Sequence, residues 1–102
     1  MRPRKCRIVQ SSPTARFFKP RGIPLRELKI VDLKDEEWEA IRLADYEGLD
    51  QESAAQKMGI SRPTFSRVLA SARRAVAKAL AEGAALAIGG GDAQLDCRDP
   101  DA

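Results

Sequence analysis

The feature that most constrains this chain is a break between two helix-forming segments. Gly59 ends an apolar helical pattern, whereas Ser61 and Pro63 are typical of a helix start. A serine side chain caps free backbone N–H groups, and proline is tolerated in the first helical turn because its missing N–H is not needed there. The sequence therefore predicts two helices, Gln51–Met58 and Arg62 to about Glu82, joined by a sharp turn.

A further helix is expected before this pair. Three acidic residues starting at Asp35 place negative charge at the positive end of a helix dipole. An apolar face follows and Gly48 ends it, so we expect a helix over Asp35–Glu47. Asp50 is then suited to cap the next helix through its side-chain oxygen.

Short extended segments are expected on both sides of the helices. Proline is frequent in the first 24 residues, which disfavours helix there. Alternation predicts short strands at residues 6–9, 29–33 and 84–88. The expected fold is mainly α, a three-helix bundle with short β segments near both ends. It divides into a basic arm (1–33), a helical domain with a C-terminal extension (34–91) and an acidic, disordered tail (92–102).

The long last helix is expected to be two-faced. Apolar residues at three- and four-residue spacing predict its buried stripe, which comprises Phe65, Val68, Leu69, Ala72, Val76 and Leu80. The facing stripe comprises Ser66, Arg67, Arg73, Arg74 and Lys78. Trp38 and Met58 are expected to join Phe65 in the core, because large apolar side chains are usually buried.

Charge is segregated along the chain although the net charge is only +3. Residues 1–29 carry nine basic side chains and one acid, residues 30–61 carry three basic and nine acidic ones, and residues 62–78 carry five basic ones and no acid. Clustered Lys and Arg displace counterions from phosphates, which favours a polyanion partner. Solvated charged faces are the alternative interpretation.

Several classes of function find no support in the sequence. There is no histidine, and the two cysteines, Cys6 and Cys97, lie at opposite ends, so one chain does not supply a zinc site. They are interpreted as free thiols, or as a disulfide if the two ends meet. No phosphate-binding glycine loop or activated nucleophile is present, so we expect neither an enzyme nor a cofactor. No apolar run could span a bilayer, and a cytoplasmic protein is expected.

The segment around Gly59 meets the physical requirements of a helix-turn-helix. Ala55 is small enough for two helices to cross closely, and glycine adopts the left-handed backbone of the turn at little cost. Ile60, Phe65 and Val68 would lock the second helix onto the first. An ordinary helical hairpin could share this pattern, but the exposed Arg, Thr and Ser side chains after the turn favour contact with bases and phosphates.

Longer segments resemble known families. The passage LKDEEWEAIRLADYEGLDQESAAQKMGISRPTFSRVLASARRAVAKAL resembles region four of bacterial sigma factors, a helix-turn-helix module that reads promoters. Together with RPRKCRIV, FFKPRGIPL and GAALAIGGG it also resembles the uncharacterised prokaryotic domain-of-unknown-function family one-three-four, over about residues 2–91. That resemblance implies a DNA-binding protein, whereas a stand-alone sigma factor needs regions that this chain lacks.

The expected base contacts come from the start of the last helix. We predict that its N-terminal half lies in the major groove of double-stranded DNA, with Arg62 and Arg67 donating to guanine edges and Thr64 and Ser66 assisting. The alternative for Arg67 is a contact with phosphate only.

Phosphate contacts are expected around these base contacts. The residues proposed for them are Ser61, Arg73, Arg74 and Lys78, with Gln51 either bonding a phosphate or lying on the surface. The basic arm at Arg2, Arg4 and Lys5 would enter a minor groove or follow the phosphates. A second hypothesis for this region, compatible with the first, pairs Arg7–Val9 with Ala84–Ile88 in a small sheet.

The main rival is a protein-interaction module. The Ala-rich segment 70–87 would then form an interface with RNA polymerase or with an identical subunit, which is also compatible with DNA binding. Single-stranded RNA is disfavoured, because the chain has only five aromatic residues and no cluster of them for base stacking.

Overall fold

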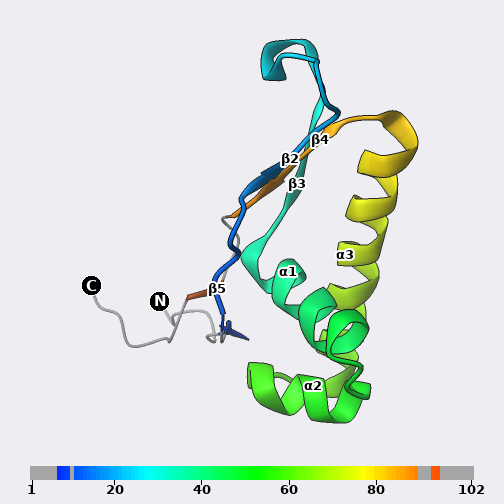
Figure 1. The fold of residues 1–102 in the computed structure, drawn as a ribbon. Helices are drawn as coiled ribbons and strands as arrows, with labels where there is room; N and C mark the ends of the chain where they lie inside the picture. Colours follow the sequence, from blue (N-terminus) through cyan, green and yellow to red (C-terminus); the bar gives the residue numbers. More distant parts are fainter. Residues whose placement is uncertain (1–6, 10, 90–92, 95–102) are drawn as a thin grey trace, which may run out of the picture.

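Helices dominate the computed structural model, which describes residues 7–9, 11–89 and 93–94. The helical elements are α1 (Asp35–Ile41), its continuation η2 (Arg42–Tyr46), α2 (Gln51–Met58), α3 (Arg62–Glu82) and the short 3-10 turn η1 (Leu25–Glu27). The strands are β1 (Arg7–Ile8), β2 (Phe17–Phe18), β3 (Ile30–Leu33), β4 (Ala85–Ile88) and β5 (Ala93–Gln94). The expected mainly α fold, with three helices and short strands near both ends, is confirmed (Figure 1).

A three-stranded sheet stands beside α3. Its order is β2-β4-β3, with β2 antiparallel and β3 parallel to the central strand β4. Phe18 and Val31 both pair with Leu86, so these three side chains share one face of the sheet. The face that carries Leu86 packs against α3 and forms a second part of the core (Figure 1).

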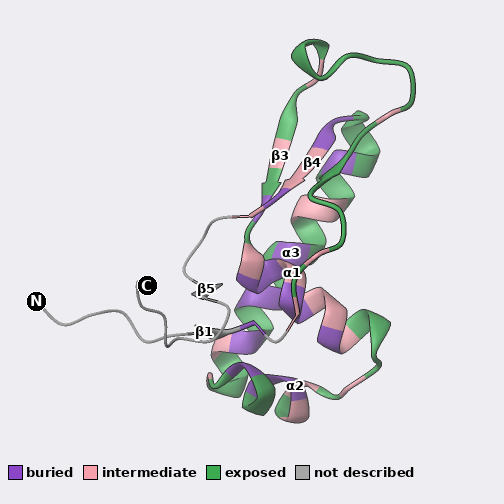
Figure 2. Cartoon of the chain, turned by 60° about the vertical axis from the view of Figure 1, so that its left-hand side comes forward, coloured by how far each residue is buried: buried purple, intermediate pink, exposed green. Residues whose placement is uncertain are grey.

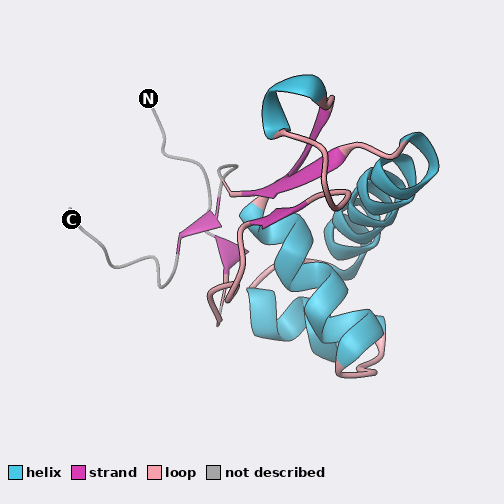
Figure 3. Cartoon of the chain, turned by 45° about the horizontal axis from the view of Figure 1, so that its top comes forward, coloured by secondary structure: helices cyan, strands magenta, loops and turns pink. Residues whose placement is uncertain are grey.

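A separate two-stranded pairing joins the two ends of the described chain. β1 runs parallel to β5, with Arg7 opposite Ala93 (Figure 3). The prediction that Arg7–Val9 pairs with Ala84–Ile88 is therefore wrong, because β2 and β3 already occupy both edges of β4. Ala93–Gln94, expected to be disordered, forms β5, whereas the remainder of the predicted tail lies outside the described residues.

The core has two connected parts (Figure 2). In the first, α1 with η2, α2 and α3 meet around Leu43, Met58, Phe65 and Leu69, all of them buried. In the second, α3 meets the sheet, and Trp38 packs at the margin. This second cluster is built on Leu33, Ala72 and Ile88, with Val76 and Leu86 against it. The core positions expected for Met58 and Phe65 are confirmed, whereas Trp38 is only half-buried.

The far end of α3 departs from the expected stripe. Leu80 is 80% exposed, whereas Ala79 is only 6% exposed, so the prediction that Leu80 is buried is wrong. At about 100° per residue, Leu80 lies roughly 70° from the centre of the face that Phe65 and Ala72 bury, and Ala79 lies within about 30° of that centre on the other side. No helix in the described part of the chain is long and apolar enough to cross a membrane.

The first helix contains a π-helical turn that the sequence pattern did not predict. After Ile41 the backbone widens, and the Glu47 N–H donates to the carbonyl of Arg42 at 2.8 Å. Arg42 spans this turn with its side chain, donating to both carboxylate oxygens of the buried Glu39 and to Glu47. Its guanidinium lies 5.9 Å from the centre of the Trp38 ring. The expected single α-helix over Asp35–Glu47 is corrected to an α segment followed by a π segment.

The orientation of α3 can be tested with one substitution made at two positions. Leu69→Ala removes a buried side chain and should lower the free energy of unfolding by about 2–5 kcal/mol. Leu80→Ala removes an exposed one and should change it by less than about 0.5 kcal/mol. Urea denaturation of dilute protein measures both. Equal losses for the two variants would contradict the observed orientation of α3.

Candidate nucleic-acid interface

Two capping side chains and one glycine set the position of the α3 N-terminus. Asp50 accepts a hydrogen bond from the Ser53 N–H at 2.7 Å and so begins α2. Gly59 ends α2 in the left-handed conformation, with φ of 68°. Ser61 begins α3, and its hydroxyl oxygen accepts from the Thr64 N–H at 3.3 Å. The predicted caps and the bounds of both helices are confirmed, so the chain turns sharply between α2 and α3.

The apolar residues behind the turn hold it closed. The Ile60 N–H donates to the carbonyl of Ala55 at 3.1 Å, which satisfies one of the free carbonyls at the end of α2. Ala55 is buried where α2 faces α3, and Ile60 packs against the same cluster as Phe65. Because the inner face of α3 is fixed in this way, its outer face has a defined orientation.

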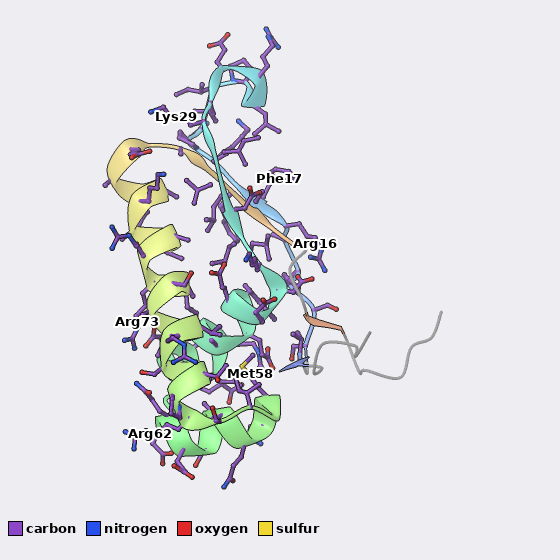
Figure 4. All side chains as sticks on the ribbon, turned by 180° about the vertical axis from the view of Figure 1, so that it is seen from behind. Arg16, Phe17, Lys29, Met58, Arg62 and Arg73 are labelled. Carbon is purple, nitrogen blue, oxygen red and sulfur yellow. The ribbon has the colours of Figure 1, made fainter. Side chains whose placement is uncertain are left out.

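The residues predicted to contact bases lie at this end of α3. Arg62, Ser66 and Arg67 are exposed, and Figure 4 shows Arg62 at the end of the molecule that α2 and the start of α3 form. Thr64 is half-buried, and its hydroxyl oxygen accepts from the Ser61 hydroxyl at 3.0 Å. Gln51 is half-buried at the start of α2. The geometry thus leaves Arg62, Ser66 and Arg67 most accessible.

The basic residues farther along α3 differ in their contacts. Arg73 donates to both carboxylate oxygens of Asp45 on η2, at 2.7 and 3.1 Å. This guanidinium lowers the pKa of Asp45, and the carboxylate in turn raises the pKa of Arg73. Arg74 and Lys78 are exposed. A phosphate would therefore have to compete with Asp45 for Arg73.

The N-terminal part of the predicted interface is not placed. Arg2, Arg4 and Lys5 lie outside the described residues, so their expected contacts stay predictions. Among the described basic residues of the arm, Arg16 contacts the protein itself, donating to Asp35 and to the Ile88 carbonyl, each at 3.2 Å.

Sequence reasoning missed three buried carboxylates on α1, Glu36, Glu37 and Glu39. Glu37 accepts from the Lys34 N–H at 2.8 Å and from the Ser71 hydroxyl on α3, which ties the start of α1 to α3. A polar pocket of about 260 Å³ lies here, lined by Lys34, Glu36, Glu37, Thr64, Arg67, Val68 and Ser71. The acidic first turn, Asp35 to Glu37, is visible in the sequence, but compensation of the helix dipole accounts for it without burial, so the pattern does not predict buried carboxylates. No group of metal-ligating side chains occurs among the described residues.

Comparison with known proteins identifies the family of this fold. Residues 1–96 match the model of the family described as Protein of unknown function DUF134, and the chain belongs to that family. A UPF0251 protein of Halothermothrix orenii is 57% identical over 92% of this chain and 70% of its own length. Another, of Pelotomaculum thermopropionicum, is 57% identical over 92% and 71%.

The relatives differ in how far they extend beyond the matched region. The UPF0251 protein of Desulforudis audaxviator is 53% identical over 95% of this chain, yet the match covers only 63% of the relative. No solved structure matches the chain significantly. The comparisons therefore establish the family of this chain.

The different surroundings of Arg73 and Arg74 give a prediction that needs no ligand. Since Arg73 lowers the pKa of Asp45 in the folded chain, their ion pair stabilises the fold above the unfolded pKa of about 3.9, and this contribution is lost as the pH falls through the lowered value. Arg73→Gln should therefore lower the urea midpoint near neutral pH, with a difference from wild type that shrinks in acid. The pair is exposed, so added salt should also shrink the difference.

The neighbouring Arg74→Gln is the matched control. It removes a guanidinium that is also exposed and for which the described part of the chain provides no carboxylate within ion-pair distance, so its effect should not depend on pH in the acidic range. A loss for Arg73→Gln that stays constant from neutral to acidic pH would contradict the assigned pairing.

Proposed function

We propose that this protein binds double-stranded DNA sequence-specifically and regulates transcription, with α2 and α3 acting as a helix-turn-helix. The observation that carries this proposal is the exposure of Arg62, Ser66 and Arg67 on the first turns of α3, which carry no acidic side chain of their own. The nearest acids belong to other elements, Glu36 and Glu37 on α1 beside Arg67 and Asp50 at the start of α2. Arg donates two parallel hydrogen bonds to the major-groove edge of guanine, which is the commonest specific base contact. A helix end is narrow enough to enter that groove.

A row of basic side chains extends this surface along α3. At about 100° per residue, Arg67, Arg74 and Lys78 lie within roughly 40° of one another around the helix. They are all exposed, and α3 carries no acid before Glu82. We assign base contact to Arg62 and Arg67, phosphate contact to Arg74 and Lys78, and a supporting role to Ser61, Thr64, Ser66 and Gln51.

The resemblance of the helix-turn-helix segment to sigma region four is consistent with the proposed role in transcription. The helix-turn-helix resemblance to sigma region four supports a role on promoter DNA, and such a role needs neither catalysis nor a cofactor and would be exercised in the cytoplasm. The second candidate is a protein interface, with RNA polymerase as partner. It is favoured by apolar side chains that lie exposed on the sheet and on the last turns of α3.

Selection of binding sites from random duplex DNA by the full chain tests the proposal directly. Retention on the selected duplex, on single-stranded RNA and on core RNA polymerase, measured at matched salt, then separates the candidates. We expect an enriched duplex motif and the strongest retention on it. Absence of enrichment together with retention on polymerase would favour the second candidate.

Substitution of Arg67 distinguishes sequence-specific base contact from non-specific electrostatic binding to DNA. Arg67→Ala should cost about 1–3 kcal/mol of discrimination at one base pair of the selected site and leave binding to unrelated duplexes nearly unchanged. Competition of matched and mismatched duplexes measures this. An equal loss on every duplex would mean that Arg67 contacts phosphate only.

Salt dependence distinguishes the two neighbouring arginines of α3. Arg74→Ala should reduce the slope of log affinity against log salt by about 0.9, the value for one lost phosphate contact. Arg73→Ala should reduce it less, because Asp45 already holds that guanidinium. Fluorescence anisotropy at several salt concentrations gives both slopes, and a larger reduction for Arg73 than for Arg74 would overturn this assignment.

A further inference from the structure

Exposed apolar side chains gather at the end of the molecule opposite to the candidate interface. Apart from Tyr46, every large apolar side chain that is exposed in the described part belongs to the segment 17–30 or to the last turns of α3. Phe18 is 56% exposed and Leu80 is 80% exposed. A soluble monomer rarely leaves such side chains gathered in one region, so this end calls for a covering partner.

The region contains an apolar groove. It has a volume of about 320 Å³ and lies between the end of α3 and the strands β2 and β4. Apolar groups dominate its wall, which is formed chiefly by Phe18, Pro20, Val76, Leu80 and Leu86. Its size suits one or two inserted aliphatic side chains.

The same end carries a projecting loop with exposed apolar side chains, which match the apolar wall of the groove. Residues 19–28 extend beyond the sheet, and nearly all of this loop is exposed (Figure 2). The loop presents Ile23 and Leu25 to solvent. It is nevertheless ordered by its own hydrogen bonds, from the Lys19 ammonium to the Ile23 carbonyl at 2.7 Å and from the Glu27 N–H to the Pro24 carbonyl at 2.9 Å. A loop ordered in advance loses little entropy when it binds.

We propose that two copies of this chain form a dimer through this loop and this groove. Ile23 and Leu25 of each copy would pack into the groove of the other. A two-fold interface requires one surface that is complementary to itself, and a groove beside an apolar projection on the same end satisfies that requirement. Arg21 and Arg26 flank the apolar loop residues, and Glu82, which precedes Gly83 of the groove wall, offers them a carboxylate. Lys19, the charged residue that lines the groove itself, donates to the Ile23 carbonyl of its own loop.

The proposed dimer goes beyond DNA binding and is compatible with it. α3 has 21 residues and is therefore about 30 Å long, and the groove lies at its C-terminal end. Both α3 N-termini, with Arg62 and Arg67, would stay uncovered. The dimer would thus offer two reading ends to DNA, as two-fold symmetric regulators do.

Sedimentation equilibrium of the full chain without DNA tests the proposal. Wild type should form a dimer. Leu80→Glu, which places a charge in the groove, and Ile23→Asp, which places one on the loop, should each raise the dissociation constant at least about tenfold. Both side chains are exposed, so both variants should keep the wild-type circular dichroism spectrum. Tyr46→Glu changes the one exposed large apolar residue of the described part that lies outside this end of the molecule, so it is the matched control and should dimerise like wild type.

Mixing the two variants tests the exchange itself. Leu80→Glu keeps an intact loop and Ile23→Asp an intact groove, so a mixed dimer regains one of the two contacts and should be tighter than either variant alone. A monomeric wild type at every soluble concentration, or a mixture no tighter than its components, overturns the proposal. Arg67→Ala should dimerise normally, so a failure to bind DNA and a failure to dimerise are distinguishable.

Discussion

The packing of Phe65 against Met58 and Leu43 is the interaction on which the rest of this structure depends. It buries one face of α3 beneath α2 and η2, and it fixes the turn at Gly59, whose left-handed backbone lets the chain reverse within a few residues. Because that face is buried, Arg62 and Arg67 at the start of α3 lie on its exposed side. The candidate interface is thus a consequence of core packing as much as of its own polar residues.

α3 connects two ends of different chemistry. Its first turns carry exposed basic and hydroxyl side chains and no acid, whereas its last turns carry Leu80 beside an apolar groove. Two of the buried carboxylates on α1 are held by specific partners, Glu37 by hydrogen bonds from the Lys34 N–H and the Ser71 hydroxyl and Glu39 by its ion pair with Arg42. Given the proposed function and the proposed dimer, the separation of the two ends would keep the DNA-binding surface and the protein-binding surface from obstructing each other.

The sequence predicted those parts of the fold that local chemistry determines. Capping by Asp50 and Ser61 and the glycine between them correctly predict both ends of α2 and the start of α3, because each signal acts within a few positions. Features that depend on distant partners were missed. The pairing of β1 with β5 and the ion pair of Arg73 with Asp45 depend on residues that meet only in the folded chain. The π-helical turn is different, because Arg42 bonds Glu39 and Glu47 nearby in the sequence, and an apolar pattern that ends at a glycine does not distinguish a π turn from an α turn. The exposure of Leu80 was missed because the apolar stripe was continued in steps of four residues from Ala72 through Val76, which turns Leu80 away from the buried face where Ala79 lies.

The most direct test of the central claim is an NMR footprint of the ¹⁵N-labelled chain titrated with its selected duplex. We expect the largest amide shifts from Ser61 to Arg67 and at the start of α2. The loop 19–28 should change little. Shifts concentrated on that loop and on the last turns of α3, with the start of α3 unaffected, would contradict the assignment of the α3 N-terminus as the DNA-reading surface.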